Sequence, residues 1–145
     1  RSEGLPLIRE KVELENAANV NDNEQNSSKN QTNFSPQLIN ITQAYALFNQ
    51  NAAVFVDARD KWEYGDGHIK SAVNIPEYKF EPSDTSKLNA NKDELLVIYC
   101  GGNDCDVSKR LAVELAELGY QRLFVFEGGW DEWMQAGYPV SEDKQ

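Results

Sequence analysis

The sequence predicts an α/β domain in which helices cover both faces of a parallel β-sheet. Short runs of apolar and β-branched residues alternate with segments whose apolar residues recur at helical spacing. Strands that alternate with helices in this way pair in parallel. The runs AVFVDA (53–58) and ELLVIYC (94–100) are also almost continuously apolar, which is typical of strands buried on both faces.

The chain of 145 residues suits one folded domain, which we expect over residues 36–141. Residues 1–35 are predicted to be an N-terminal extension, and residues 142–145 a short tail. From about residue 18 the extension is rich in Asn, Gln and Ser. Such a tract buries too little apolar surface to offset its ordering entropy, so we expect a flexible linker there.

Five strands are expected, each a short apolar run bounded by turn residues: LINI (38–41), AVFVDA (53–58), AVNIP (72–76), ELLVIYC (94–100) and RLFVF (122–126). The segments between them are predicted to be helical: TQAYALFN (42–49) capped by Thr42, a turn in DKWEYGDG (60–67), short turns within 77–93, a helix over 106–118 and GGWDEWMQAG (128–137). The helix over 106–118 has the strongest pattern, with one apolar stripe and Asp106 as its expected N-cap.

Ligands of parallel α/β sheets bind beyond the carboxyl ends of the strands. The loop CGGNDCD (100–106) follows the strongest predicted strand, which places Cys100 at such an end. The amides of the loop are expected to form an anion-binding nest that leads into a helix N-terminus; its residues are Gly101, Gly102, Asn103, Asp104 and Asp106. This setting favours a thiolate at Cys100 and would stabilise a persulfide anion. The alternative is a structural Cys buried at a strand end.

Composition excludes several classes of function. The net charge of −10 argues against nucleic acid as a partner. Two cysteines and one histidine provide neither a disulfide framework nor a zinc-ligand pattern. We therefore expect chemistry at cysteine with no metal and no cofactor.

Three ordered motifs resemble the rhodanese family of sulfurtransferases, over roughly residues 35–140. VFVDARDKWEYGDGHIKSAVNIP resembles the first signature of the family, VIYC resembles the strand that delivers its catalytic cysteine, and FEGGWDEWMQAGYPV resembles its closing signature. The resemblance implies a single rhodanese-like domain whose five-stranded parallel sheet has helices on both faces. It also implies that Cys100 takes up a sulfane sulfur.

The loop departs from the pattern of family members that act on thiosulfate, which often carry Arg as the last residue of a six-residue loop. Cys105 stands at that place, and the loop resembles a variant subgroup with a Cys-x4-Cys arrangement. Asp104 and Asp106 would repel a dianionic donor and oppose thiolate formation. A Cys-x5-Arg phosphatase or arsenate reductase loop is disfavoured, because it would need Arg at position 106.

Three roles for Cys105 are open: a second sulfur carrier, a resolving thiol that forms a disulfide with Cys100, or a small packing residue. Asp57 and Arg59 end the second strand, and we expect a structural ion pair that supports the loops. Contact between Arg59 and substrate is the alternative.

The leading hypothesis for function is a sulfurtransferase that carries sulfur as a persulfide on Cys100. Its expected partners are a small donor and a thiol or protein acceptor; persulfide and polysulfide are favoured as donors over thiosulfate. A thiol redox or sensing module and a non-catalytic interaction domain are the alternatives.

The chain begins with Arg1 rather than Met, so we expect a piece of a longer protein. A membrane tether would have to come from segments outside it, and bacterial cytoplasm and cell envelope both remain open.

Overall fold

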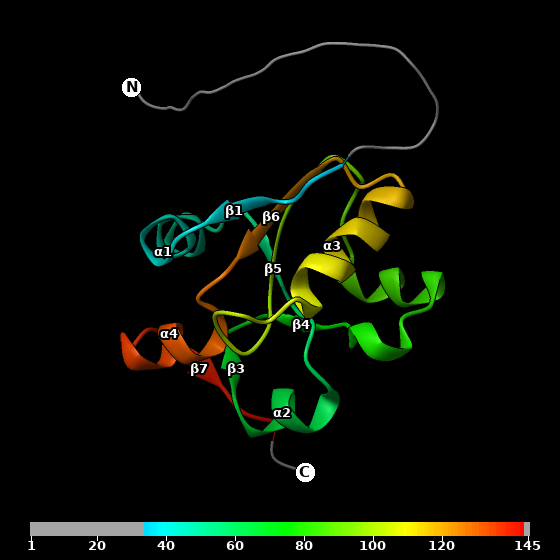
Figure 1. Cartoon of the computed structure of the whole chain (residues 1–145). Helices are drawn as coiled ribbons and strands as arrows, with labels where there is room; N and C mark the ends of the chain where they lie inside the picture. The colour runs from blue at the N-terminus through cyan, green and yellow to red at the C-terminus, as the bar shows by residue number, and fades with distance from the viewer. Residues whose placement is uncertain (1–33, 144–145) are drawn as a thin grey trace, which may run out of the picture. The chain divides into compact units, whose positions relative to one another are not determined.

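The sheet is built from five short strands that pair in parallel in the order β1-β6-β5-β2-β4 (Figure 1). The computed structural model describes residues 34–143, so most of the predicted extension and linker lies outside the described residues. The strands are β1 (Gln37–Ile39), β2 (Val54–Asp57), β4 (Val73–Asn74), β5 (Leu95–Tyr99) and β6 (Arg122–Phe126). The predicted parallel sheet is confirmed, and each of its strands overlaps a run that the sequence indicated. Strand β1 differs most, because Asn40 and Ile41 of the predicted run belong to the start of the helix that follows.

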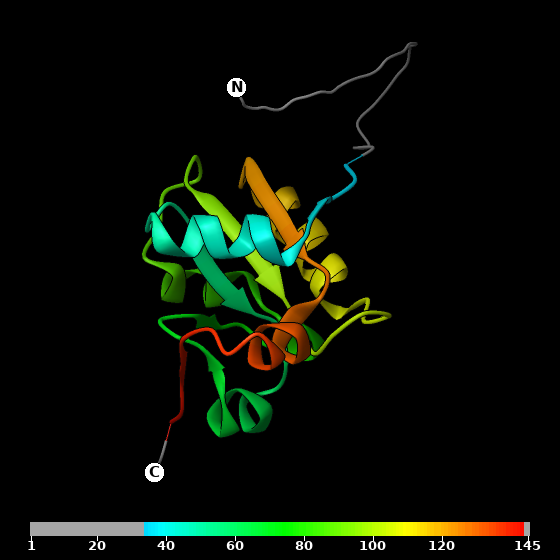
Figure 2. The ribbon, with the colours of Figure 1, turned by 90° about the vertical axis from the view of Figure 1, so that its left-hand side faces the viewer.

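The helices are α1 (Ile41–Asn49), α2 (Lys61–Asp66), α3 (Val107–Glu117) and α4 (Gly129–Gln135), with 3-10 turns η2 (Glu77–Lys79) and η3 (Pro82–Leu88). Helices α1 and α4 lie on one face of the sheet, while α3 and η3 lie on the other, as Figures 1 and 2 show. Within residues 34–143, none of the helices combines the length and apolar character that a membrane crossing requires.

Strand β5 divides the core because its side chains alternate between the two faces. Val97 and Tyr99 pack in the cluster on the α1 and α4 side, which is centred on the fully buried Trp133. Leu96 and Ile98 pack in the cluster on the α3 and η3 side. Every residue of β5 is buried, which explains why its sequence is apolar without alternation.

Helix α1 begins one residue earlier than the sequence indicated, and the predicted Thr42 cap is wrong. Asn40 is the N-cap: its side chain accepts a hydrogen bond from the Gln43 amide at 2.8 Å. The Gln43 side chain accepts in turn from the Asn40 amide at 2.9 Å. This reciprocal capping box gives two backbone N–H groups an acceptor, and a cap at Thr42 would leave both without one.

Asn40→Ala is expected to lower the free energy of unfolding by about 1 kcal/mol, because the first turn of α1 loses its cap. Urea denaturation followed by circular dichroism measures the change. Thr42→Ala is the matched control and should change stability by less than about 0.5 kcal/mol. An equal effect of the two substitutions would contradict this account of the cap.

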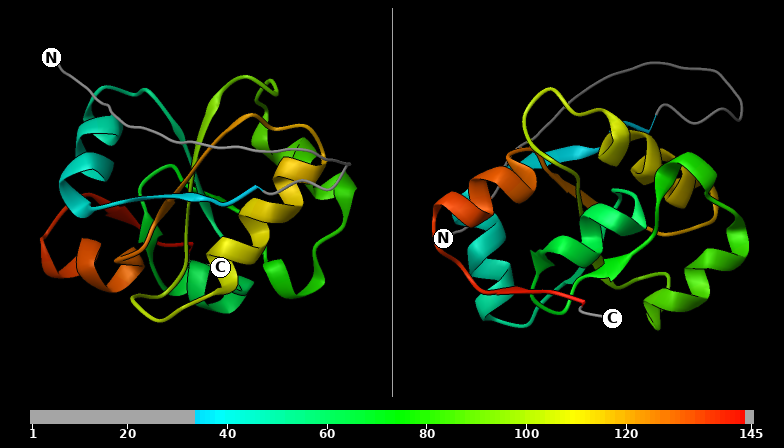
Figure 3. Two further views of the ribbon diagram at one scale, coloured as in Figure 1. Left: turned by 45° about the horizontal axis from the view of Figure 1, so that its top comes forward. Right: turned by 90° about the horizontal axis from the view of Figure 1, so that it is seen from below.

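A small antiparallel pair was not predicted from the sequence. Strands β3 (His68–Ile69) and β7 (Val140–Ser141) form it, and each has only two residues, too few to show a period. The pair joins the segment that follows α2 to the segment that follows α4, and Figure 3 shows the red and green segments running close to each other.

Candidate active site

Cys100 lies directly after β5, at the carboxyl edge of the sheet. Asp57 at the end of β2 pairs in register with Tyr99, so the two central strands end side by side. Cys100 is 3% exposed, and it lines a pocket of about 460 Å³. Because Cys100 is almost buried but borders a pocket, a substrate can reach its sulfur only from the pocket side. This arrangement suits a nucleophilic cysteine. A larger hollow of about 900 Å³ lies by α2 and β4, but neither cysteine lines it.

Helix α4 holds the start of the loop through its first amides. Trp130 N–H donates to the Cys100 carbonyl at 2.9 Å, and Asp131 N–H donates to the Gly101 carbonyl at 2.8 Å. Gly129 makes this approach possible, since its φ is +62° and a Cβ there would lie 2.5 Å from the Cys100 carbonyl oxygen. The sequence predicts Gly129 only as part of a helix start, although the Gly-Gly pair at 128–129 is a signal of close backbone packing.

The loop folds back on itself in a turn from Gly102 to Cys105. Cys105 N–H donates to the Gly102 carbonyl at 3.2 Å, and Asp104 takes the left-handed conformation with φ of +69°. Asp tolerates this conformation better than most residues. Neither Gly101 nor Gly102 has the positive φ that their freedom permits. The absence of a side chain matters at Gly102, where a Cβ would lie 2.9 Å from the Asp131 carboxylate.

Within the described part of the chain, the amides of Gly101, Gly102, Asn103 and Asp104 donate no hydrogen bond to a protein group. These amides are free of protein acceptors, which an anion-binding nest requires, and binding of an anion by the loop stays a prediction. Asp106 occupies the N-cap position of α3, but the predicted side-chain cap is wrong. Its ψ of −4° departs from the extended conformation in which a cap side chain reaches the first-turn amides.

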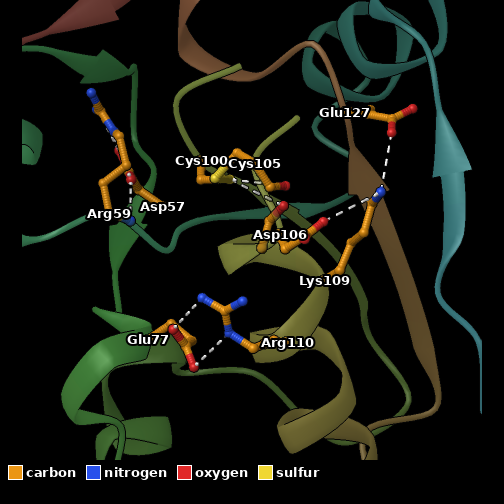
Figure 4. The surroundings of a disulfide bond; sticks show 10 residues. Asp57, Arg59, Glu77, Cys100, Cys105, Asp106, Lys109, Arg110 and Glu127 are labelled. Atoms are coloured by element: carbon orange, nitrogen blue, oxygen red, sulfur yellow. Dashed lines mark hydrogen bonds and ion pairs between the residues drawn. A yellow bond between two sulfur atoms is a disulfide. The ribbon is translucent and has the colours of Figure 1, made fainter. Parts of the chain in front are cut away.

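Cys105 is bonded to Cys100 in a disulfide (Figure 4). Their Cα atoms are 6.6 Å apart, within the range that a disulfide spans. The structure thus contains the bond that the resolving-thiol hypothesis requires. Roles of Cys105 as a second carrier or as a packing residue stay untested.

Ser108 is a site residue that the sequence analysis missed. Its side chain is buried in the first turn of α3, and its hydroxyl lies 3.3 Å from Cys100 Sγ, placed to donate a hydrogen bond to the sulfur. Such a donor stabilises negative charge on sulfur when Cys100 is reduced or persulfidated. The available signal was a polar residue beside the apolar stripe that begins α3.

Ser108→Ala is expected to slow the alkylation of reduced Cys100 at neutral pH by about tenfold, because the thiolate loses a hydrogen bond worth about 1–1.5 kcal/mol. The rate is measured with iodoacetamide in a Cys105→Ser background, so that one thiol reports. Ser108→Thr keeps the hydroxyl and should restore most of the rate. Equal alkylation rates for Ser108→Ala and its parent would show that Ser108 does not stabilise the Cys100 thiolate.

Asp57 and Arg59 form the expected ion pair. Both residues are buried: Asp57 is 0% exposed and Arg59 is 7% exposed. Arg59 Nη2 donates to Asp57 Oδ2 at 2.7 Å and to the Gly67 carbonyl at 2.6 Å, while Nε donates to Asp57 Oδ1 at 3.0 Å. The guanidinium also lies 5.1 Å from the centre of the Trp130 ring. Burial acts to lower the pKa of Arg59, but hydrogen bonds and charge from Asp57 outweigh it and raise that pKa above its ordinary value.

This pair links the end of β2 to the segment after α2, and it leaves the Arg59 guanidinium committed to protein groups. Figure 4 shows the guanidinium lying along Asp57 instead of turning toward the two cysteines. Burial, with the charge of Asp57 added, also raises the pKa of Tyr99 above its ordinary value, so Tyr99 stays neutral. Its hydroxyl accepts a hydrogen bond from the Ile69 amide at 3.0 Å. The contacts therefore support a structural role for Asp57 and Arg59.

The basic side chains of the first turns of α3 are also paired with carboxylates. Lys109 Nζ lies 3.2 Å from Glu127, and Arg110 Nε lies 3.4 Å from Glu77 (Figure 4). The pocket beside Cys100 is bordered by Arg59 and by three acidic residues, Asp60, Glu63 and Glu77. Asp57 neutralises Arg59 and Arg110 neutralises Glu77, so Asp60 and Glu63 leave the border of the pocket net negative.

The described residues include no cluster of three or more His, Cys, Asp or Glu side chains that could hold a metal ion. The structure places three groups against the Cys100 sulfur: the Ser108 hydroxyl at 3.3 Å, the Cys105 carbonyl oxygen at 3.7 Å and the bonded Cys105 sulfur. Of these, the Ser108 hydroxyl can donate a hydrogen bond to a charged sulfur. These groups fit a reaction in which charge develops on sulfur.

Comparison with known proteins gives a family match over residues 40–136, to the rhodanese-like domain. Among curated relatives, the tRNA uridine(34) hydroxylase of Erwinia tasmaniensis is 33% identical over 103 residues, which cover 66% of this chain and 29% of that protein. The protein of the same name from Escherichia coli K12 is 28% identical over 112 residues, 72% of this chain and 31% of that protein. The chain thus spans less than a third of the length of these relatives.

Solved structures share the fold. The BH2092 protein from Bacillus halodurans superposes with a TM-score of 0.67 at 26% identity, covering 75% of this chain and 78% of that one. A human single-domain sulfurtransferase superposes with a TM-score of 0.57 at 21% identity, covering 70% of this chain and 97% of that one.

Proposed function

Because this chain belongs to the rhodanese-like domain family, we propose that it carries sulfane sulfur as a persulfide on Cys100 and passes it to a thiol acceptor. The observation that carries the proposal is the place of Cys100, at the end of β5, on a pocket, with the Ser108 hydroxyl 3.3 Å from its sulfur. No other cysteine of the chain has this combination, since Cys105 lies on the loop and is partly exposed.

The transfer has two steps, and it starts from the reduced protein. The Cys100 thiolate attacks the sulfane sulfur of the donor, and the donor leaves as a thiolate or another anion. The outer sulfur of the resulting persulfide is then attacked by an acceptor thiolate, which returns Cys100 to its thiolate form. Negative charge stays on or near the sulfur throughout, where the Ser108 hydroxyl and the unpaired loop amides stabilise it. The reaction needs no metal and no cofactor.

The acidic border of the pocket favours donors with little negative charge. Asp60 and Glu63 repel thiosulfate, a dianion, because Glu77 is paired with Arg110 and Arg59, the basic residue that lines the pocket, is paired with Asp57. We therefore propose as the donor a persulfide or an organic polysulfide, whose reacting sulfurs carry less negative charge than thiosulfate does. The relatives named as tRNA hydroxylases extend far beyond the matched region, and the net charge of −10 argues against RNA as a partner of this chain.

Glu63→Gln is expected to raise the rate of sulfur uptake from thiosulfate about two- to fivefold at low ionic strength, because it removes a negative charge from the pocket border. The rate is measured by quenching the reaction at set times and quantifying the persulfide. Added salt should reduce the increase in rate, because it screens the charge. Glu117→Gln, at the far end of α3, is the matched control and should change little. A gain of the same size in both variants would show only an effect of net charge.

Mass spectrometry tests the proposed function. Reduced wild-type protein and the reduced Cys105→Ser variant are incubated with cysteine persulfide and desalted. Their intact masses are measured, and peptide mapping then locates any added sulfur. The proposal expects the Cys105→Ser variant to gain the mass of one sulfur atom on the peptide that contains Cys100. Failure of that variant to gain sulfur from any sulfane donor would overturn the proposal.

A thiol redox module is the second candidate, and the Cys100–Cys105 disulfide is the observation that favours it. In that case oxidants convert the dithiol to the disulfide, and Cys105→Ser takes up no sulfur. The mass experiment above separates the two functions.

A further inference from the structure

The disulfide joins the proposed sulfur carrier to the one other cysteine of the chain. We propose that Cys105 is a resolving thiol that gives the domain a further activity: it reduces the sulfane sulfur held on Cys100 to hydrosulfide and leaves the Cys100–Cys105 disulfide. This inference rests on the proposed function, because it needs a persulfide on Cys100.

The loop is built so that Cys105 reaches Cys100 within the folded protein. The turn closed by Cys105 N–H and the Gly102 carbonyl brings the chain back over its own start, with Asp104 in the left-handed conformation. The start of the loop is fixed separately by the amides of Trp130 and Asp131. The sheet and helices are intact with the bond in place, so the oxidised state belongs to the native fold. Two thiols held this way react at a high effective concentration.

The surroundings of the two sulfurs differ in a way that assigns their roles. Cys100 is 3% exposed, and the Ser108 hydroxyl is its hydrogen-bond partner. Cys105 is partly exposed and lines the same pocket. The sulfur of Cys100, stabilised by Ser108, is the better leaving group, and the partly exposed Cys105 is the cysteine that an external thiol reaches more readily.

The reaction balances without an external oxidant. The Cys105 thiolate attacks Sγ of the Cys100 persulfide, forming the Sγ–Sγ bond and breaking the bond between Cys100 Sγ and the outer sulfur. The outer sulfur leaves as hydrosulfide and gains two electrons, which the two cysteine sulfurs supply by becoming a disulfide. The proton lost by the Cys105 thiol goes to solvent or to the departing sulfide.

Turnover requires a dithiol reductant. Its first thiolate attacks Sγ of the partly exposed Cys105 from the pocket, and Cys100 leaves as the thiolate stabilised by Ser108. The second thiol of the reductant then displaces Cys105. The net reaction is reduction of one sulfane sulfur to hydrosulfide by one dithiol.

A single-turnover experiment tests the inference. The wild type, Cys105→Ser and the Cys100→Ser/Cys105→Ser double variant are reduced with dithiothreitol, freed of reductant and treated with one equivalent of cysteine persulfide. Hydrosulfide is quantified with monobromobimane, and intact masses are taken in parallel. The double variant gives the background release from the donor alone.

The wild type should release about one hydrosulfide per protein and lose the mass of two hydrogens. Cys105→Ser should keep the added sulfur and release hydrosulfide at least about tenfold more slowly. Sulfur retained equally by both proteins, or hydrosulfide released equally by both, would overturn the inference and leave the proposed function standing. Absence of sulfur uptake in Cys105→Ser would overturn the proposed function itself.

Discussion

Cys100→Ser is expected to abolish sulfur uptake from cysteine persulfide, with a fall in rate of at least about a thousandfold. A hydroxyl is a far weaker nucleophile than a thiolate at neutral pH, and the remaining Cys105 lacks the Ser108 contact. The substitution keeps the size of a nearly buried side chain, so the fold should persist. The rate is followed by mass spectrometry or by persulfide-specific labelling.

Cys105→Ser is the matched control for this prediction, and it should keep the first uptake step within about threefold of the wild type. The contrary pattern would be uptake that survives loss of Cys100 and disappears with loss of Cys105. That result would make Cys105 the carrier, which is one of the roles left open by the sequence.

Gly129→Ala is expected to lower the free energy of unfolding by about 3 kcal/mol and to slow sulfur uptake more than about tenfold. Two costs combine at this position. A positive φ costs an L-residue about 1–2 kcal/mol, and a methyl group at 2.5 Å from the Cys100 carbonyl oxygen must displace the start of the loop. Urea denaturation measures the first effect, and uptake kinetics on the folded protein measure the second.

Gly137→Ala separates these costs, because Gly137 has a φ of +76° but no atom within 4 Å of the added Cβ. It should cost about 1 kcal/mol and leave sulfur uptake unchanged. If Gly129→Ala behaved like Gly137→Ala in both measurements, the contact between α4 and the loop would have no role in placing Cys100.

Local patterns were sufficient to predict the central sheet. The runs that form β2 and β5 are almost continuously apolar, and parallel pairing then places Asp57 and Cys100 at the same edge. The order of strands and helices along the chain therefore located the candidate site. The ion pair of Asp57 and Arg59 also followed, because both residues come at a strand end.

The details that local patterns did not predict depend on contacts between segments distant in the chain. The need for glycine at 129 arises only when α4 packs against the backbone of Cys100. The position of Ser108 near sulfur depends on where α3 starts, which is set by the turn in the loop. The spacing of Cys100 and Cys105 permits a disulfide, but the folded turn decides whether they meet.

Transfer of labelled sulfur tests the central claim most directly. The Cys105→Ser variant is loaded from a persulfide donor that carries a heavy sulfur isotope in the sulfane position, desalted, and then given an acceptor thiol. The account predicts that the label sits first on Cys100 and then appears in the acceptor, while the protein returns to its starting mass. A label that never resides on Cys100, or that stays there when an acceptor thiol is supplied, would contradict it.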